Sequence, residues 1–213
     1  MERQKIQMIV HDVVQGTPEW HALRLMPTAS NFRRVFTSQK KRSTSFDEYA
    51  IELTEEKKAG RKLDTYKSEW MQRGNDLEPQ ARAMFELETG MVTTPIGFVT
   101  TDDGLIGCSP DAIVHDDENG ETALLEIKCP KPTTHIKYLL AGKVPAEYLP
   151  QVQGQLWITE QPYAYFMSFH PDHESLILRV DRDEEYISGL AAELKKLLDK
   201  VNSNLKKLGV LHG

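Results

Sequence analysis

Residues 108–130, CSPDAIVHDDENGETALLEIKCP, decide how this chain folds, because two apolar runs flank a polar turn. The runs at 111–115 and 123–128 are rich in aliphatic residues, which predicts two β-strands. The Asn119-Gly120 pair between them is a strong signal for a tight chain reversal. We therefore expect an antiparallel hairpin at the centre of the fold.

The register of this hairpin decides which of its side chains share a face. Paired residue numbers in an antiparallel hairpin have a constant sum. A turn centred on Asn119-Gly120 gives a sum of 239 and pairs Asp111 with Lys128. A longer loop centred between Glu118 and Asn119 gives 237 and pairs Asp111 with Glu126. Either sum places the three polar side chains on one face, within about 4.5–8 Å of one another, and turns the intervening Ile127 into the core.

Two carboxylates and a lysine on one strand face suit phosphodiester hydrolysis. Carboxylate oxygens are ligands that Mg²⁺ prefers, and a bound Mg²⁺ lowers the pKa of water and offsets charge in the transition state. The lysine can orient that water or stabilise the developing anion. The pattern is also compatible with an exposed Glu–Lys pair on a surface strand. Two features favour the metal site: unpaired charges within the apolar run LLEIKCP would be costly, and Pro110 keeps Ser109 extended beside Asp111.

Apolar spacing and capping signals extend the prediction to the rest of the chain. Pro79 is expected in the first turn of its helix, and the last helix is amphipathic. Helices followed by a mostly antiparallel sheet and further helices predict a mixed α/β (α+β) fold, in one domain over residues 1–213. The expected helices are 28–37, 46–58, 77–89, 146–159 and 184–208, and the expected strands are 95–101, 105–108, 111–115, 123–128, 163–169 and 176–180.

Composition excludes several classes of protein. No apolar run approaches the roughly 20 residues that cross a bilayer, and the start, MERQKIQMIVHD, lacks the apolar stretch of a secretory leader. The two cysteines, Cys108 and Cys129, are too few for a disulfide scaffold or an iron–sulfur cluster with four thiolates. We therefore expect the protein in a reducing cytoplasm, with both cysteines packed as small apolar side chains. The seven histidines show no metal-ligand spacing, and His115, His170 and His173 are expected in turns or at the surface.

The net charge of −6 is distributed unevenly. Residues 20–46 and 127–146 contain no Asp or Glu, yet together they hold ten of the 26 basic residues. Two positive surfaces on an acidic body could bind a polyanion such as DNA. Ordinary solvated faces are the alternative. The basic residues are Arg24, Arg33, Arg34, Lys40, Lys41, Arg42, Lys128, Lys131, Lys137 and Lys143.

Separated motifs along most of the chain resemble the phage lambda exonuclease family, also described as YqaJ-type viral recombinases, within the PD-(D/E)xK nuclease superfamily. In order, the motifs are PEWHALRL, TAS, RGNDLEPQAR, CSPD, LEIKCP, LPQVQGQLWIT and RVDRDEEY. The resemblance implies a restriction-endonuclease-like core, with a central mixed sheet flanked by helices.

The resemblance also implies roles for individual residues. By position, the family's Mg²⁺ ligands fall on Asp111, Glu126 and the main-chain carbonyl of Ile127, and Mn²⁺ is expected to substitute. The catalytic lysine falls on Lys128. The family's active-site glutamine and its helix-borne glutamate fall on Gln151 and Glu78 respectively.

Family members bind the 5′-phosphate of the strand that they digest, and the corresponding positions are Arg24, Ser30 and Ser109. Ser30 follows a predicted helix start, where free N–H groups favour an anion, and arginine can grip a phosphate with two hydrogen bonds. The spacing from Arg24 to Thr28 is one residue shorter than in the phage lambda enzyme. The apolar wedge that separates the strands aligns near Met71.

The function that the resemblance implies is a processive 5′→3′ exonuclease on linear double-stranded DNA, which releases mononucleotides and leaves a 3′ single-stranded tail. A homotrimeric ring and a phage single-strand annealing protein as partner are implied as well, in the cytoplasm of a bacterial host. Two alternatives remain open. One is an endonuclease or junction resolvase on the same core, and the other is a DNA-binding scaffold without nuclease activity.

Overall fold

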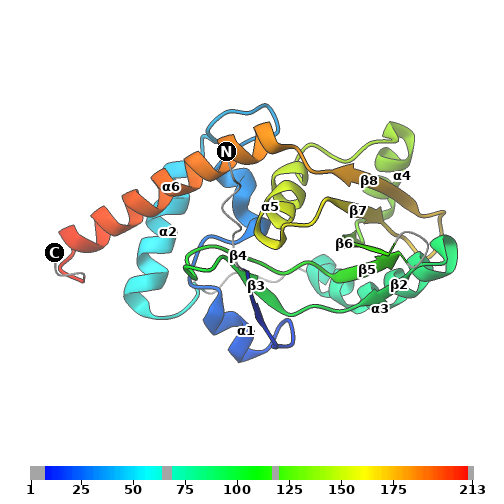
Figure 1. The fold of residues 1–213 in the computed structure, drawn as a ribbon, viewed down its shortest axis with the longest axis horizontal. Coiled ribbons are helices and arrows are strands. Elements are labelled where there is room, and N and C mark those ends of the chain that lie inside the picture. The colour runs from blue at the N-terminus through cyan, green and yellow to red at the C-terminus, as the bar shows by residue number, and fades with distance from the viewer. Residues whose placement is uncertain (1–7, 64–68, 117–119, 211–213) are drawn as a thin grey trace.

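The computed structural model describes residues 8–63, 69–116 and 120–210, and its centre is a five-stranded mixed sheet (Figure 1). The strand order is β2-β5-β6-β7-β8, in which β6 and β7 are parallel and the other neighbours are antiparallel. The strands are β2 (Val92–Thr94), β5 (Ala112–Asp116), β6 (Glu121–Lys128), β7 (Tyr163–Ser168) and β8 (Leu176–Asp181). A second sheet has the order β1-β3-β4 and contains β1 (Ile9–His11), β3 (Phe98–Thr100) and β4 (Gly107–Cys108).

Helices cover both faces of the central sheet. α3 (Glu69–Thr89) packs Ala81 and Phe85 against one face, and α5 (Leu149–Thr159) packs Val152 and Leu156 against the other. The remaining helices are α1 (Pro18–Leu23), the 3₁₀ helix η1 (Ala29–Arg34), α2 (Phe46–Ala59), α4 (Pro132–Ala141) and α6 (Glu184–Lys207). Because β6 lies between these two layers, its side chains are buried on both faces from Ala123 to Ile127.

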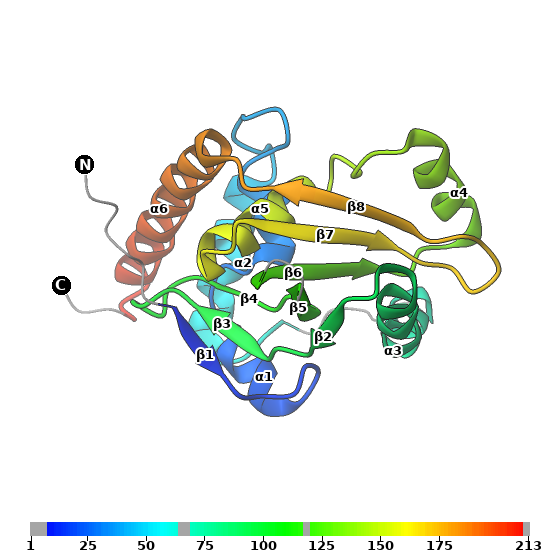
Figure 2. The ribbon, with the colours of Figure 1, turned by 45° about the vertical axis from the view of Figure 1, so that its right-hand side comes forward.

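The C-terminal helix packs on the core of its own chain. Asp183 caps the N-terminus of α6 by accepting a hydrogen bond from the Tyr186 N–H. The apolar stripe of α6 joins α2 and η1 in one hydrophobic cluster, and α6 and α2 lie together at one end of the molecule (Figure 2). The buried stripe consists of Leu190, Leu194, Leu197, Val201 and Leu205. No helix in the described part of the chain is long and apolar enough to cross a membrane.

The predicted elements at 123–128, 163–169, 176–180 and 184–208 are confirmed to within two residues, and the mixed fold is confirmed. The prediction that Pro79 lies in the first turn of its helix is wrong, because α3 begins ten residues earlier, at Glu69. Residues 69–76, EWMQRGND, have too few regularly spaced apolar residues to predict those first turns.

The sequence pattern does not predict α4. Its signals are Pro132 in the first turn and Gly142, with φ of 57°, at the C-cap. Only His135 is buried among its residues, so the helix lacks the apolar stripe by which helices are recognised in sequence. The predicted strand at 95–101 is shorter, β3 over Phe98–Thr100, and β2 precedes it.

Candidate active site

The β5–β6 hairpin brings together the two carboxylates that the sequence predicts as metal ligands. Ala112 pairs with Leu125, so paired residues sum to 237, and the register that places Asp111 opposite Glu126 is confirmed. The Asp111 N–H donates to the Leu125 carbonyl (3.0 Å), and the Ile127 N–H donates to Asp111 Oδ2 (2.5 Å). Ile127 itself points into the core, as predicted, and packs on the side of the sheet that α3 covers.

Three titratable side chains, those of Asp111, Glu126 and Lys128, meet in this small space. Glu126 is only 1% exposed, and its Oε1 accepts an ion-paired hydrogen bond from Lys128 Nζ. Burial and the charge of Glu126 raise the pKa of Asp111 well above its ordinary value. Burial alone would lower the pKa of Lys128, but the carboxylates of Glu126 and Asp111 outweigh it and raise that pKa. Lys128 is therefore protonated at neutral pH.

The helix α5 presents two side-chain amides to Glu126. Gln151 Nε2 donates to Glu126 Oε1 (2.5 Å), and Gln155 Nε2 donates to Glu126 Oε2 (2.6 Å). The two glutamines are four residues apart, so they lie on the same side of the helix. Gln151 was expected at the site, but Gln155 was not, although its spacing from Gln151 is a signal that was available in the sequence.

From α3, Glu78 adds a third carboxylate to the same cavity. Burial is the main cause that raises its pKa, and the charge of Glu126 adds to the effect while Arg82 and Lys128 oppose it. Glu78 is half-buried within α3 rather than near its N-terminus. A macrodipole effect at a helix end therefore does not account for this residue.

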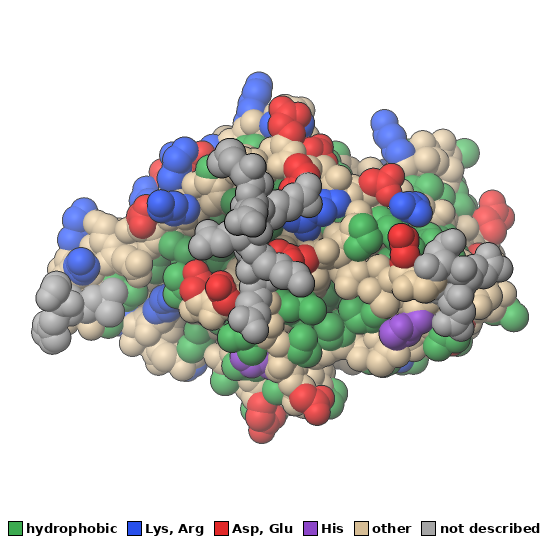
Figure 3. All heavy atoms as spheres, viewed as in Figure 1, with side chains coloured by type: hydrophobic (Ala, Val, Ile, Leu, Met, Phe, Trp, Pro, Cys, Tyr) green, Lys and Arg blue, Asp and Glu red, His purple; other side chains and the backbone are tan. Residues whose placement is uncertain are grey.

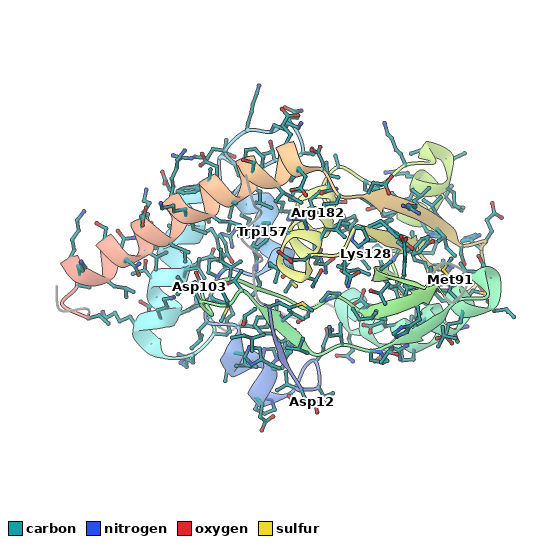
Figure 4. The ribbon with its side chains drawn as sticks, in the orientation of Figure 1. Asp12, Met91, Asp103, Lys128, Trp157 and Arg182 are labelled. Carbon is teal, nitrogen blue, oxygen red and sulfur yellow. The ribbon has the colours of Figure 1, made fainter. Side chains whose placement is uncertain are left out.

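One cavity of about 540 Å³ contains nearly all the predicted site residues. Lys128 lies near the centre of the molecule, next to α5 (Figure 4). Met71 belongs to α3, but its side chain lies outside the described part of the structure. The predicted residues that line the cavity are Arg24, Ser30, Glu78, Ser109, Asp111, Glu126, Ile127, Lys128 and Gln151.

The three residues predicted to bind the 5′-phosphate are linked through Trp20 by hydrogen bonds and by stacking. Trp20 Nε1 donates to Ser109 Oγ (2.9 Å), and the Arg24 guanidinium stacks on the Trp20 ring at 3.8 Å from its centroid. Arg24 Nη2 donates to Ser30 Oγ (3.1 Å), which also contacts Thr28 Oγ1 (3.3 Å). Burial lowers the pKa of Arg24 to about 10, so the guanidinium is still charged at neutral pH.

The first acid-free stretch, residues 20–46, is largely neutralised by carboxylates from other parts of the chain. Arg34 forms a two-pronged ion pair with Glu52, at 2.6 and 2.7 Å. The other pairs are Arg33 with Glu147, Lys40 with Glu185 and Arg42 with Glu193. Acidic and basic side chains are accordingly intermixed over the α6 end of the face in Figure 3. The pairs reduce the positive surface expected there, whereas Arg24, Lys128 and Lys131 of the acid-free stretches line the cavity.

His170 was expected in a turn or at the surface. It begins a turn, since the His173 N–H donates to the His170 carbonyl (3.1 Å), but it is not at the surface. His170 is buried, and its ring lies 5.0 Å from that of His173 and 6.1 Å from that of His135. His135 belongs to α4, whereas His170 and His173 follow β7, so the three rings come together only in the tertiary structure. Both nitrogens of His135 are engaged, with Ser168 Oγ (2.8 Å) and the Glu174 carbonyl (2.9 Å).

The donor set of the cavity fits a hard divalent cation. Asp111 and Glu126 place two carboxylates side by side, and burial, together with the charge of Glu126, raises the pKa of Asp111. A cation bound between them would favour the ionised form of both. No group of three His, Cys, Asp or Glu side chains close enough to hold a metal ion occurs in residues 8–63, 69–116 and 120–210. Mg²⁺ does not require one, because it usually binds one or two carboxylates and keeps several waters.

A mixed sheet whose adjacent strands bring together Asp111, Glu126 and Lys128, with helices on both faces, is the restriction-endonuclease-like core of the PD-(D/E)xK class. A family model described as the YqaJ-like viral recombinase domain matches residues 19–162. The chain belongs to the family of YqaJ-like viral recombinase domains, as its sequence motifs predict.

Solved structures agree with this assignment. An alkaline exonuclease from Laribacter hongkongensis has 31% sequence identity and a TM-score of 0.81, covering 91% of this chain and 96% of that one. Its complex with dAMP has 32% identity and a TM-score of 0.80, covering 90% and 96%. A phage-related exonuclease from Haemophilus somnus 129PT shares the fold, with 15% identity and a TM-score of 0.65 over 86% and 96% of the chains. No curated protein sequence matches the chain.

Proposed function

We propose that this protein is a Mg²⁺-dependent, processive exonuclease that digests linear double-stranded DNA in the 5′→3′ direction. It releases mononucleotides and leaves a 3′ single-stranded tail for recombination by strand annealing. The observation that carries the proposal is that one cavity holds both the Arg24–Ser30–Ser109 group and the Asp111–Glu126–Lys128 group. An exonuclease needs this combination, since it must recognise a strand end and hydrolyse a bond next to it.

The distance between the two groups supports release of single nucleotides. Ser109 and Asp111 are two residues apart, and Pro110 between them favours an extended chain. Two extended residues span about 7 Å. A terminal phosphate held at Ser109 would therefore lie about one nucleotide from the carboxylate at Asp111. The Laribacter hongkongensis structure with dAMP shows that a relative binds a mononucleotide.

The residues of this chain have separate tasks in the proposed reaction. Asp111, Glu126 and the Ile127 carbonyl would hold Mg²⁺, or Mn²⁺ in its place, which supplies a Lewis acid and lowers the pKa of bound water. Lys128, which stays protonated, donates to the attacking water or to the phosphate oxygens that gain charge. Gln151 donates to Glu126 and holds it beside Lys128, and Glu78 adds negative charge that favours the cation.

Arg24, Ser30 and Ser109 bind the terminal phosphate in this proposal. The Arg24 guanidinium supplies charge, and stacking on Trp20 fixes its plane. Ser109 already accepts a hydrogen bond from Trp20, so its own proton is available for a phosphate oxygen. Met71, which aligns with the family's apolar wedge, remains the proposed residue for strand separation.

The proposal includes an assembly and a cellular setting. Family resemblance supports a homotrimeric ring of a single exonuclease domain spanning residues 1–213, and a phage single-strand annealing protein as partner. The two cysteines are free thiols, which suits the reducing cytoplasm of a bacterial host. Light scattering at working concentration should give three copies per particle. A stable monomer that digests DNA processively would contradict the ring.

Digestion of one linear duplex, labelled at either end and prepared with and without 5′-phosphate, tests the activity. The expected result is Mg²⁺-dependent release of mononucleotides from the 5′ end, faster with the phosphate, and no cutting of a closed circle. Internal fragments or a cut circle would identify an endonuclease or resolvase. DNA binding with no product in Mg²⁺ or Mn²⁺ would identify a scaffold without nuclease activity.

A further inference from the structure

The carboxylate of Glu126 is held by three donors that differ in their access to the cavity. Lys128 and Gln151 both donate to Oε1, and both are partly exposed. Gln155 donates to Oε2 at 2.6 Å and is fully buried. Among the described residues, Gln155 is thus the donor that holds the second oxygen, and solvent does not compete for this hydrogen bond.

The carbonyl oxygen of the Gln155 side chain indicates that Glu126 imposes the orientation of the Gln155 amide. Gln155 Oε1 is buried and has no hydrogen-bond partner within the described part of the chain. A turn of the amide by 180° would bring that oxygen against Glu126 Oε2, which repels it when the carboxylate is ionised. The amide therefore keeps its donor on Glu126 even though its carbonyl is left unpaired, and an unpaired buried acceptor is unfavourable.

A neighbouring glutamine on the same helix shows what a purely structural amide looks like. Gln153 is also buried, but both of its amide atoms are paired with the main chain, at the last residue of β8 and at the N-cap of α6. Its Nε2 donates to the Asp181 carbonyl (2.8 Å), and its Oε1 accepts from the Asp183 N–H (2.9 Å). Gln153 faces away from Glu126 and does not line the cavity.

We propose that Gln155 is a positioning residue for the cation site: it fixes the orientation of the Glu126 carboxylate through Oε2 and acts on the reaction only through Glu126. This inference rests on the proposed function, in which Glu126 is a metal ligand. Partners that orient a metal ligand typically contribute a factor of about 10–100 to metal affinity. Gln155 is thus expected to affect affinity for the cation more than stability of the fold.

The test compares Gln155→Met with Gln153→Met, two substitutions of equal size on one helix. Binding of Mn²⁺ to the full-length protein is measured by the loss of the free-ion electron paramagnetic resonance signal, without DNA, and metal-free thermal unfolding is measured in parallel. Gln155→Met should raise the half-saturating Mn²⁺ concentration roughly 10- to 100-fold with little change in Tm. Gln153→Met should lower Tm and leave Mn²⁺ affinity within about twofold. If Gln155→Met does not unfold cooperatively, Gln155→Leu takes its place.

The possible failures are distinguishable. Equal Mn²⁺ affinity of wild type and Gln155→Met overturns the positioning role and leaves the proposed metal site intact. If Gln153→Met weakens Mn²⁺ binding as much as Gln155→Met does, the positioning role is also overturned, because the effect would then come from a disturbance of α5 as a whole. Failure of the wild-type protein to bind Mn²⁺, with or without duplex DNA, overturns the proposed function itself.

Discussion

Trp20 Nε1 donates a 2.9 Å hydrogen bond to Ser109 Oγ, across 89 positions of sequence. The same indole ring carries the Arg24 guanidinium on its face. One buried side chain therefore fixes two groups of the proposed phosphate site, one by a hydrogen bond and the other by stacking. Its role is geometric, since it brings no charge of its own.

Trp20→Phe should reduce the preference for 5′-phosphorylated ends. Phenylalanine keeps an aromatic face for Arg24 but loses the donor to Ser109, a hydrogen bond worth about 1 kcal/mol, or roughly fivefold in kcat/KM. The measurement is kcat/KM on duplexes with and without 5′-phosphate. Trp157→Phe is the matched control, since Trp157 packs against the core outside the cavity. An unchanged phosphate preference in Trp20→Phe would contradict this role.

Arg24→Ala should remove the advantage of a 5′-phosphate and affect 5′-hydroxyl ends much less. A charge-assisted contact from a partly buried guanidinium is worth about 1.5–3 kcal/mol, so the phosphate advantage should fall at least tenfold. Rates on the same pair of duplexes measure it, and Arg33→Ala, an exposed arginine outside this cavity, is the control. Equal losses on both ends would make Arg24 a general backbone contact.

Lys128→Ala should abolish turnover and leave affinity for duplex DNA within a few-fold. The cation is needed where charge develops on the phosphate, so its loss lowers kcat rather than binding. Single-turnover rates and fluorescence anisotropy separate the two quantities. Lys137→Ala, on the exposed side of α4, should behave as wild type. Turnover at the wild-type rate in Lys128→Ala would remove the lysine from the mechanism.

Glu52→Gln should make stability less dependent on pH in acid. The hydrogen bond from Arg34 lowers the pKa of Glu52 in the folded protein. The ion pair therefore stabilises the fold above the ordinary pKa of glutamate, and this stabilisation is lost as pH falls through the lowered value. Solvent screening limits the effect to about 1 kcal/mol or less. The measurement is Tm of wild type and Glu52→Gln at intervals from about pH 3 to about pH 7, a range that includes the ordinary pKa of glutamate. If the ion pair contributes nothing, Tm will change with pH equally in the two proteins.

Gly154→Ala should destabilise the protein and disturb the site. A Cβ at Gly154 would lie 2.2 Å from the Phe32 ring, so α5 could no longer approach η1 so closely. Overpacking of this kind costs about 1–3 kcal/mol, and a shift of α5 would move Gln151 and Gln155 together. Gly74→Ala, on α3 where nothing lies within 4 Å, is the control. Equal Tm values for the two variants would contradict the argument.

Much of the fold and the centre of the site follow from local sequence. The hairpin turn and the alternation of residues in β6 restrict Asp111, Glu126 and Lys128 to one face in either register, because side chains alternate strictly along a strand. Similarly, the apolar stripe of α6 predicts its length. These features depend on residues only a few positions apart, so they can be predicted from the sequence.

Other features of the site and of the surface depend on contacts between residues that are far apart in the sequence. The packing of α5 on the sheet brings Gln155 to Glu126, and the approach of α1 to the end of β4 brings Trp20 to Ser109. Ion pairs with distant carboxylates neutralise much of the basic stretch at 20–46, and α4 buries His135 without an apolar stripe of its own. The physical reason is the same in each case: burial, hydrogen bonding and charge pairing depend on distances in space, which the order of residues along the chain does not specify.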